Sequence, residues 1–212
     1  MPDAIAIPVP SRWGTLLALA FAVGALAADA AGLLAARRST LARALLELDR
    51  PAQALQSAES ALRWDPWQPR TVYTRCVALK RLGRWATLAE AAEIGLKWDP
   101  DATSLEWLLG EAAFRLDRPG IAAEVLWRAF RHTPVPAHSG AQLWRMALLA
   151  GARAWGSDDP RVCAAAVLAL RLAEDDPLLS SADRAALRHE ATAALAAAGA
   201  PAAARSVAET RP

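Results

Sequence analysis

Trp64-Asp65-Pro66 returns as Trp98-Asp99-Pro100, and the step from position 64 to position 98 sets an interval for the chain. A second motif keeps the same interval: Leu48-Asp49-Arg50-Pro51 returns as Leu116-Asp117-Arg118-Pro119 after two such steps, with Leu82-Gly83-Arg84 halfway between them. A fixed period within the range of roughly 20 to 50 residues is typical of supersecondary units that stack and bury their apolar faces on one another. The period therefore predicts an array of short units, an architecture that points to binding rather than to catalysis.

The composition predicts helices throughout. Ala and Leu dominate, hydrophobic residues make up 54% of the 212 positions, and no segment alternates in the β-branched pattern of a strand. We therefore expect an all-α protein. The formal net charge is +2, and acidic and basic residues are interspersed, without the concentrated basic face of nucleic-acid-binding proteins. This pattern argues against a nucleic-acid partner.

The N-terminal segment 13–36 is apolar apart from Asp29, with Arg12 before it and Arg37 and Arg38 after it. About 20 apolar residues suffice to cross the hydrocarbon core of a bilayer. We therefore predict a single transmembrane anchor over 13–36, preceded by an extended tail over residues 1–12.

Two other interpretations of this segment stay open. Ala25-Leu26-Ala27 resembles the small-residue cleavage site of a signal peptide, although the basic region before it is thin. The second interpretation is a helix buried in the core of a soluble protein, because Ala is only weakly lipophilic and Asp29 is costly inside a bilayer.

The side of the membrane is contested. Arg37, Arg38 and Arg43 after the span outnumber Arg12 before it, which favours a cytoplasmic C-terminal domain. By analogy with known bacterial proteins that carry one N-terminal span and a repeat domain, we expect the array in the periplasm of an inner-membrane protein. The sequence leaves the cytoplasm open.

The repeats resemble the tetratricopeptide (TPR) family, whose units are helix–turn–helix pairs of about 34 residues, the interval found here. With Pro66, Pro100 and Pro134 as the closing prolines, three contiguous units span 35–68, 69–102 and 103–136. The small residues that let paired helices approach in this family fall mostly in register, and they are Ala54, Ala58, Ala61, Ala92, Gly95, Gly110, Ala122 and Ala129. The resemblance implies a TPR-type α-solenoid covering about half the chain.

After residue 136 the period breaks. Segment 137–199 reads as a degenerate fourth unit, with about nine extra residues in its turn, followed by a polar-faced capping helix over Ser181 to Ala198. Ser157-Asp158-Asp159-Pro160 is a helix-start signal within this segment, and residues 200–212 read as a flexible tail.

Two further expectations concern the repeat positions. Asp49, Gly83 and Asp117 are predicted to form the tight turn inside each unit. Trp64 and Trp98 fall where the family usually has a large apolar residue sealed against the next unit, so we expect both to be buried.

In the TPR family, the first helices of successive units line a concave groove. The resemblance therefore implies a partner-binding groove made of Arg43, Arg70, Tyr73, Lys80, Arg81, Trp107, Glu111, Phe114 and Arg115. Aromatic residues and Arg often dominate protein interfaces, so we expect a polypeptide partner with apolar and acidic residues. The alternative is that these arginines form a solvated face and the aromatics pack on the neighbouring unit.

Convergent catalytic groups are not evident. His132 and His138 flank an inter-unit loop, His189-Glu190 lacks the second ligand of a zinc-hydrolase helix, and no glycine-rich phosphate loop occurs. Cys76 and Cys163 belong to no paired motif and read as buried thiols. We predict no catalytic, metal or cofactor site.

These patterns together predict a membrane-tethered scaffold or adaptor of the bacterial cell envelope that binds another envelope or membrane protein. The alternative is a non-catalytic regulatory subunit of a membrane enzyme such as a polysaccharide polymerase or ligase. Both functions rest on analogy with the family rather than on particular residues.

Overall fold

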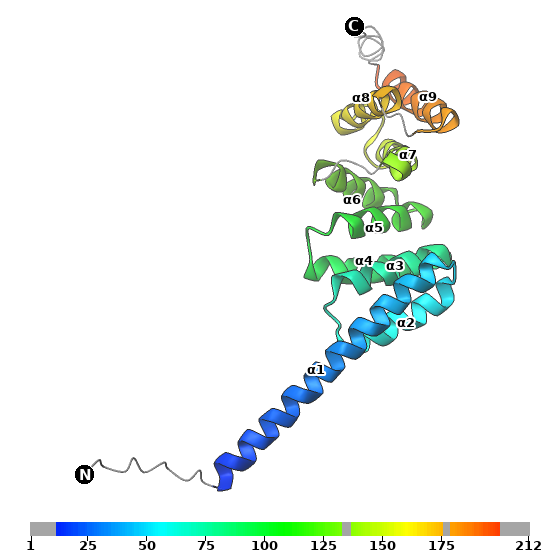
Figure 1. The fold of residues 1–212 in the computed structure, drawn as a ribbon. Helices are drawn as coiled ribbons and strands as arrows, with labels where there is room; N and C mark the ends of the chain where they lie inside the picture. The colour runs from blue at the N-terminus through cyan, green and yellow to red at the C-terminus, as the bar shows by residue number, and fades with distance from the viewer. Residues whose placement is uncertain (1–11, 133–136, 176–178, 200–212) are drawn as a thin grey trace, which may run out of the picture.

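The structure is a computed structural model that describes residues 12–132, 137–175 and 179–199 (Figure 1). Within these ranges the chain is all-α, as predicted. The helices are α1 (Arg12–Glu47), α2 (Pro51–Trp64), α3 (Pro69–Arg81), α4 (Trp85–Trp98), α5 (Thr103–Arg115), α6 (Pro119–His132), α7 (Ala137–Trp155), α8 (Pro160–Asp175) and α9 (Ser181–Ala197). The predicted C-terminal tail and most of the predicted N-terminal tail lie outside the described residues.

The helices form antiparallel pairs that stack in one direction (Figure 1). Each helix packs on the next along the chain, and the first helix of each pair also packs on the first helix of the following pair: α1 on α3, α3 on α5, and α5 on α7. The buried apolar residues accordingly fall into four clusters along the stack. This layering confirms the predicted solenoid of helix pairs.

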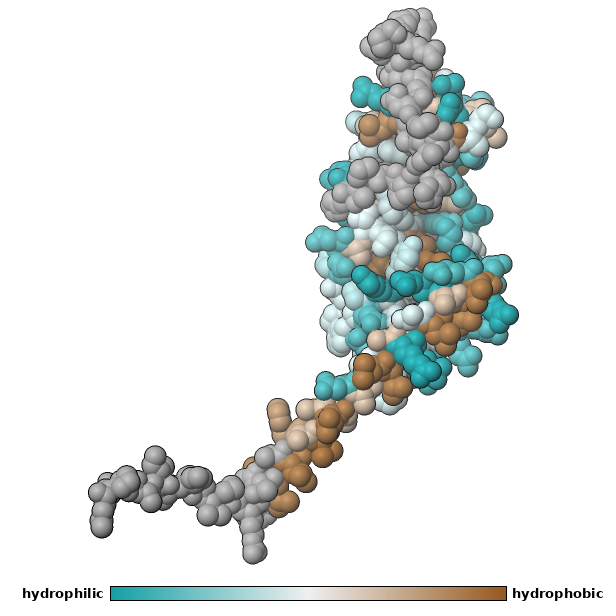
Figure 2. All heavy atoms as spheres, viewed as in Figure 1, coloured by the Kyte–Doolittle hydropathy of each residue, from teal (hydrophilic) through white to brown (hydrophobic). Residues whose placement is uncertain are grey.

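α1 combines the apolar segment and the first helix of the first unit in one uninterrupted element of 36 residues. Its C-terminal part is buried at Ala35, Ala42 and Leu46, whereas its N-terminal part projects from the stack and exposes apolar side chains (Figures 1 and 2). Of the described helices, it alone is long and apolar enough to cross a membrane, and only 6% of its most apolar stretch is buried. This exposure excludes the alternative in which the apolar segment is a helix buried in the core of this chain.

Small residues let the two helices of a unit approach closely. Ala54, Ala58 and Ala61 of α2 are at most 1% exposed. In the third unit the small residue is on the first helix and the large one is on the second helix. Gly110 of α5 lies against the fully buried Leu126 of α6, and a Cβ on Gly110 would lie 2.5 Å from Leu126 Cδ2. The missing side chain of Gly110 is therefore what makes room for the larger Leu126.

The turns inside the first three units are equivalent. Asp49, Gly83 and Asp117 follow one another at the repeat interval, and each adopts a positive φ, of 54°, 68° and 57°. The amide of the following residue donates to a carbonyl five positions back, as in Arg50 N to Leu45 O at 2.8 Å. This is the left-handed helix end that Gly favours and that Asp tolerates, so the predicted turn positions are confirmed.

The inter-unit turns follow Asp65 and Asp99, and Pro66 and Pro100 lie in them as predicted. In the first turn the Trp67 amide donates to Asp65 Oδ1 at 3.3 Å, a local bond of the kind expected for this Asp. The third closing proline, Pro134, lies outside the described residues.

The prediction that Trp64 and Trp98 are buried is wrong, because their exposed fractions are 56% and 58%. Both rings lie at the C-terminal ends of second helices, at the edge of the stack, where the next unit does not cover them. The Trp98 ring instead contacts Trp67, with ring centroids 3.7 Å apart.

The fourth unit is longer than the others, but most of its extra residues do not lie in its internal turn, 156–159. They lengthen the helices, since α7 has 19 residues where α3 and α5 have 13, and α8 has 16 where α2 and α4 have 14. α8 begins at Pro160 as predicted, and Asp159 Oδ1 accepts the Arg161 amide at 2.8 Å.

α9 has the features of the predicted capping helix. The Ser180 side chain caps it by accepting the Asp183 amide. Leu187, Ala191 and Leu195 bury its apolar side.

Candidate functional site

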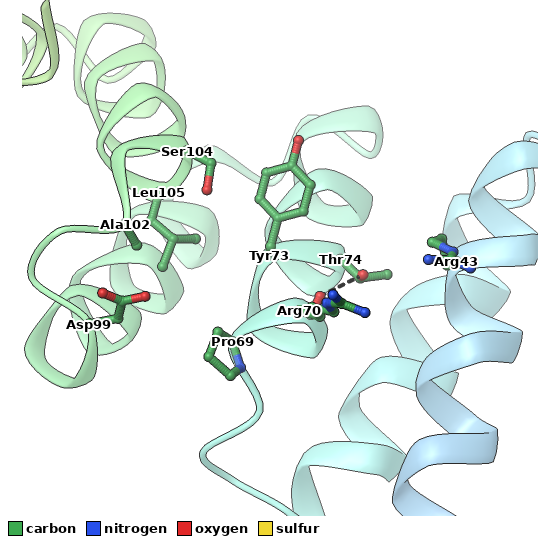
Figure 3. Close-up of a pocket in the computed structure, with 9 residues that line it drawn as sticks. All are labelled: Arg43, Pro69, Arg70, Tyr73, Thr74, Asp99, Ala102, Ser104 and Leu105. Carbon is green, nitrogen blue, oxygen red and sulfur yellow. Dashed lines mark hydrogen bonds between the residues drawn. The ribbon is translucent and has the colours of Figure 1, made fainter. Parts of the chain in front are cut away.

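A hollow of about 390 Å³ opens on the inner face of the first units, where the first helices α1, α3 and α5 meet the loop after α4 (Figure 3). Its walls comprise Arg43, Pro69, Arg70, Tyr73, Thr74, Asp99, Ala102, Ser104 and Leu105. We refer to this hollow as the inner pocket. It contains three of the predicted groove residues, Arg43, Arg70 and Tyr73.

Two arginines from neighbouring helices give the inner pocket a basic side. Arg43 comes from α1 and Arg70 from the first turn of α3, and both are exposed (Figure 3). The first turn of α3 carries no acidic residue, so the positive end of its helix dipole adds to the two guanidinium groups. Asp99 is the acidic residue of the opposite wall (Figure 3).

Tyr73 supplies the aromatic surface of the inner pocket. Its ring stands between α3 and the start of α5 and is 43% exposed (Figure 3). Behind it, Thr74 is buried and its Oγ1 donates to Arg70 O at 2.7 Å. An exposed ring beside two guanidinium groups suits a ligand with both apolar and anionic groups.

The position of α3 relative to α1 is set at this end of the helix. Pro69 begins α3, where a missing amide proton costs nothing. Thr71 is fully buried and its Oγ1 donates to Ser39 Oγ of α1 at 2.8 Å. This bond links the two helices that carry Arg43 and Arg70.

Arg43 Nε lies 4.0 Å from Oε1 of Glu47 on the same helix, and both side chains are exposed. The predicted basic residues outside the inner pocket contact other elements of the chain. Lys80 Nζ lies 2.6 Å from Glu111 Oε2, and this carboxylate is buried. Arg81 Nη1 donates to Leu46 O at 2.5 Å and lies 3.3 Å from Asp49 Oδ1. The Arg115 guanidinium lies 5.5 Å from the centroid of the Trp85 ring. These residues tie one element to another, and they line no wall of the inner pocket.

Trp107, one of the residues that the resemblance placed in the groove, is buried. It is 9% exposed and packs edge-on against Phe130 of α6, with centroids 4.6 Å apart. Phe114 is partly buried against the same cluster, which also contains Leu143 and Met146 of α7. The alternative stated for the aromatics, that they pack on the neighbouring unit, therefore holds for Trp107 and Phe114 but not for Tyr73.

The wall formed by Asp99, Ala102 and Ser104 was not predicted. These residues belong to the loop after α4 and the start of α5, whereas the prediction considered only groove-facing positions of first helices. The signal that could have found them is the recurrence of Asp-Pro at the inter-unit loops, because such a loop must pass beside the first turn of the next helix.

The described residues give little support for chemistry at this site. No group of three or more His, Cys, Asp or Glu side chains that could hold a metal ion occurs among them. Cys76 is fully buried, and burial raises the pKa of its thiol to about 12, so it is a poor nucleophile at neutral pH. The side chain of His138 lies outside the described set.

Solved structures of TPR proteins share this fold. The chain superimposes on YrrB, described as a TPR protein with an unusual peptide-binding site, with a TM-score of 0.60 and 18% identity over 80% of each chain. It also superimposes on MamA with a TM-score of 0.57 and 16% identity, over 85% of this chain and 98% of that chain. A third structure, the MamA RS-1 ArsTM double mutant, superimposes with a TM-score of 0.55 and 16% identity, over 76% of this chain and 94% of that chain.

No protein-family model matches the sequence, and no curated protein matches it either. At such low identities, the similarity to the solved structures establishes the fold alone. The fold is a TPR-type α-solenoid with a long apolar helix at its N-terminus.

Proposed function

We propose that the chain is a membrane-tethered scaffold of the bacterial cell envelope that binds an acidic, partly apolar polypeptide segment in the inner pocket. The observation that carries this proposal is the pairing of two exposed guanidinium groups with the exposed Tyr73 ring in one hollow. Arg binds carboxylates in directed, charge-assisted pairs, and Tyr supplies contact area at a small entropy cost.

The inner pocket suits a peptide better than a small molecule or a nucleic acid. It is an open hollow between helices, so an extended or helical segment can lie along it rather than be enclosed. Its basic character comes from two arginines and is balanced by Asp99, unlike the continuous basic face that a polyanion requires. YrrB, which has the same fold, is described as having a peptide-binding site, and this likeness supports a peptide ligand here.

Tethering is proposed from the exposed apolar part of α1. Leu17, Phe21 and Leu26 are between 70% and 81% exposed along this helix, and water alone would not favour that arrangement. A bilayer provides the apolar surroundings that the rest of the chain does not.

A photo-crosslinking experiment in native membranes tests the proposal. A benzophenone amino acid replaces Tyr73 in the full-length chain, and the matched control carries it at Ile94, which is 51% exposed on α4 and lies outside the inner pocket. We expect a specific polypeptide adduct from position 73 that is absent from position 94.

The charge of the inner pocket provides the second arm of this experiment. Arg43→Glu with Arg70→Glu should abolish the adduct from position 73, because both carboxylates would then face an acidic ligand. Arg63→Glu, an exposed site on α2 outside the inner pocket, should leave it intact. An adduct of equal yield in the doubly reversed variant would refute the inner pocket as the binding site.

A further inference from the structure

Three exposed tryptophans gather at one end of the helix pairs. Trp64 ends α2, Trp67 lies in the loop that follows, and Trp98 ends α4, with exposed fractions of 56%, 56% and 58%. Among the tryptophans whose side chains the structure describes, only these three are exposed. The Trp67 and Trp98 rings touch edge to face, at 3.7 Å between centroids, so two units contribute to one patch. We call Trp64, Trp67 and Trp98 the tryptophan patch.

The tryptophan patch lies level with the end of the apolar part of α1. The bond from Thr71 to Ser39 places the start of α3 beside that residue of α1. Trp67 lies in the loop before α3, four residues before Thr71. The same step back along α1 from Ser39 reaches Ala35, beside the last residue of the apolar segment. Because its ring contacts Trp67, Trp98 lies at this level too.

Cationic residues lie beside the tryptophans and just after the apolar segment, and Asp65 and Asp99 directly follow Trp64 and Trp98. Arg37 and Arg38 follow the apolar segment directly, Arg63 precedes Trp64, and Lys97 precedes Trp98. All four are exposed. Cations placed just outside the hydrocarbon attract anionic lipid headgroups.

We propose that the tryptophan patch inserts into the headgroup region of the bilayer that α1 crosses, and that it holds the first two units against the membrane surface. Indole rings favour this region, because their apolar body enters the acyl boundary while the N–H stays hydrated. The inference rests on the proposed tethering and adds to it a second, independent contact with lipid. It also explains why the rings are not covered by the next unit.

Fluorescence quenching in proteoliposomes tests this contact. The full-length chain is reconstituted in phosphatidylcholine and phosphatidylglycerol vesicles whose acyl chains are brominated either near the ester or near the terminal methyl. Bromine quenches tryptophans only at close range. We expect strong quenching of tryptophan emission by the shallow bromines. In the triple variant that combines Trp64→Phe, Trp67→Phe and Trp98→Phe, we expect the quenched share of emission to fall at least about two-fold.

The matched control is Trp85→Phe, which removes a tryptophan at the opposite end of α4 and should not lower the quenched share. Alkaline carbonate extraction of the same vesicles reports separately on α1. If the chain resists extraction but the triple variant is quenched as strongly as the parent, the lipid contact of the patch is refuted while tethering stands. If carbonate releases the parent chain, tethering fails and this inference fails with it.

A protein partner for the patch is the competing outcome. A benzophenone amino acid at position 98 in native membranes should give lipid adducts, visible by mass spectrometry of the intact chain. A polypeptide adduct in their place would assign the patch to a protein and overturn the proposal.

Discussion

Lys80 Nζ lies 2.6 Å from Glu111 Oε2 and joins α3 to α5 across the inner face of the solenoid. The two partners differ in exposure, since the Glu111 side chain is 5% exposed and the Lys80 side chain 41%. The contact therefore neutralises a carboxylate that folding removes from water.

Removing the cation of this pair should destabilise the repeats. Lys80→Ala leaves Glu111 buried without its partner, and we expect a loss of about 2–3 kcal/mol of unfolding free energy in detergent. Lys97→Ala, at an exposed site, is the control and should change stability by less than about 0.5 kcal/mol. Adding Glu111→Gln to Lys80→Ala should recover part of the loss, and equal costs for the two lysine variants would contradict the interpretation.

Gly110 makes a second sharp prediction, because a Cβ there would lie 2.5 Å from Leu126. Gly110→Ala should cost about 1–3 kcal/mol, since both helices are packed and one must shift. Gly120→Ala on α6 meets nothing within 4 Å and should be neutral or slightly stabilising. Thermal unfolding followed by circular dichroism compares the two, and a double variant with Leu126→Ala should cost less than the sum of its parts.

The turn at Gly83 tests the equivalence of the units. Its φ of 68° is close to those of Asp49 and Asp117, so the position accepts a residue that tolerates the left-handed region. Gly83→Asp should lower stability by well under about 1 kcal/mol, whereas Gly83→Val should cost about 1–2 kcal/mol because a branched Cβ clashes with the backbone there. Denaturant titrations measure the unfolding free energy of both variants. Equal losses for Gly83→Asp and Gly83→Val would contradict the equivalence of the turns.

Cys76 should be silent toward thiol reagents in the folded chain. Burial raises the pKa of its thiol from 9.0 to about 12, so neither access nor ionisation favours reaction at neutral pH. In a Cys163→Ser background, maleimide should label the chain only after denaturation. In a Cys76→Ala background, the partly exposed Cys163 should react without denaturant.

The same shift has a consequence for stability. Because the pKa of Cys76 is higher in the folded state than in the unfolded state, its contribution is intact below about pH 9 and falls as pH rises toward 12. Cys76→Ala should therefore weaken the decline of stability over this range, as measured by denaturant midpoints at each pH. An unchanged slope would show that the thiol remains accessible to hydroxide in the fold.

The period allowed the fold to be predicted because turns and closely packed positions are local properties of the sequence. Asp49, Gly83 and Asp117 form equivalent turns because each unit must reverse the chain in the same way. Closely packed positions such as Ala54 and Ala58 are buried because the distance between paired helices is constant. These features recur wherever the period holds.

The candidate site was less predictable, because it depends on what covers each repeat position. Tyr73 and Trp107 occupy the same position of successive units, yet one is 43% exposed and the other 9%. Trp107 lies under Phe130 and residues of the long α7, whereas Tyr73 faces the open start of α5. Exposure at a repeat position is set by the neighbouring unit, which the period does not describe.

α1 runs from Arg12 to Glu47 without a proline, and its last part is a structural member of the first repeat. No flexible linker therefore separates the apolar segment from the solenoid, and a rotation or tilt of the segment must turn the first helix pair with it. In the proposed tethered state, a force that tilts the segment in the bilayer would therefore also rotate the helices that line the inner pocket.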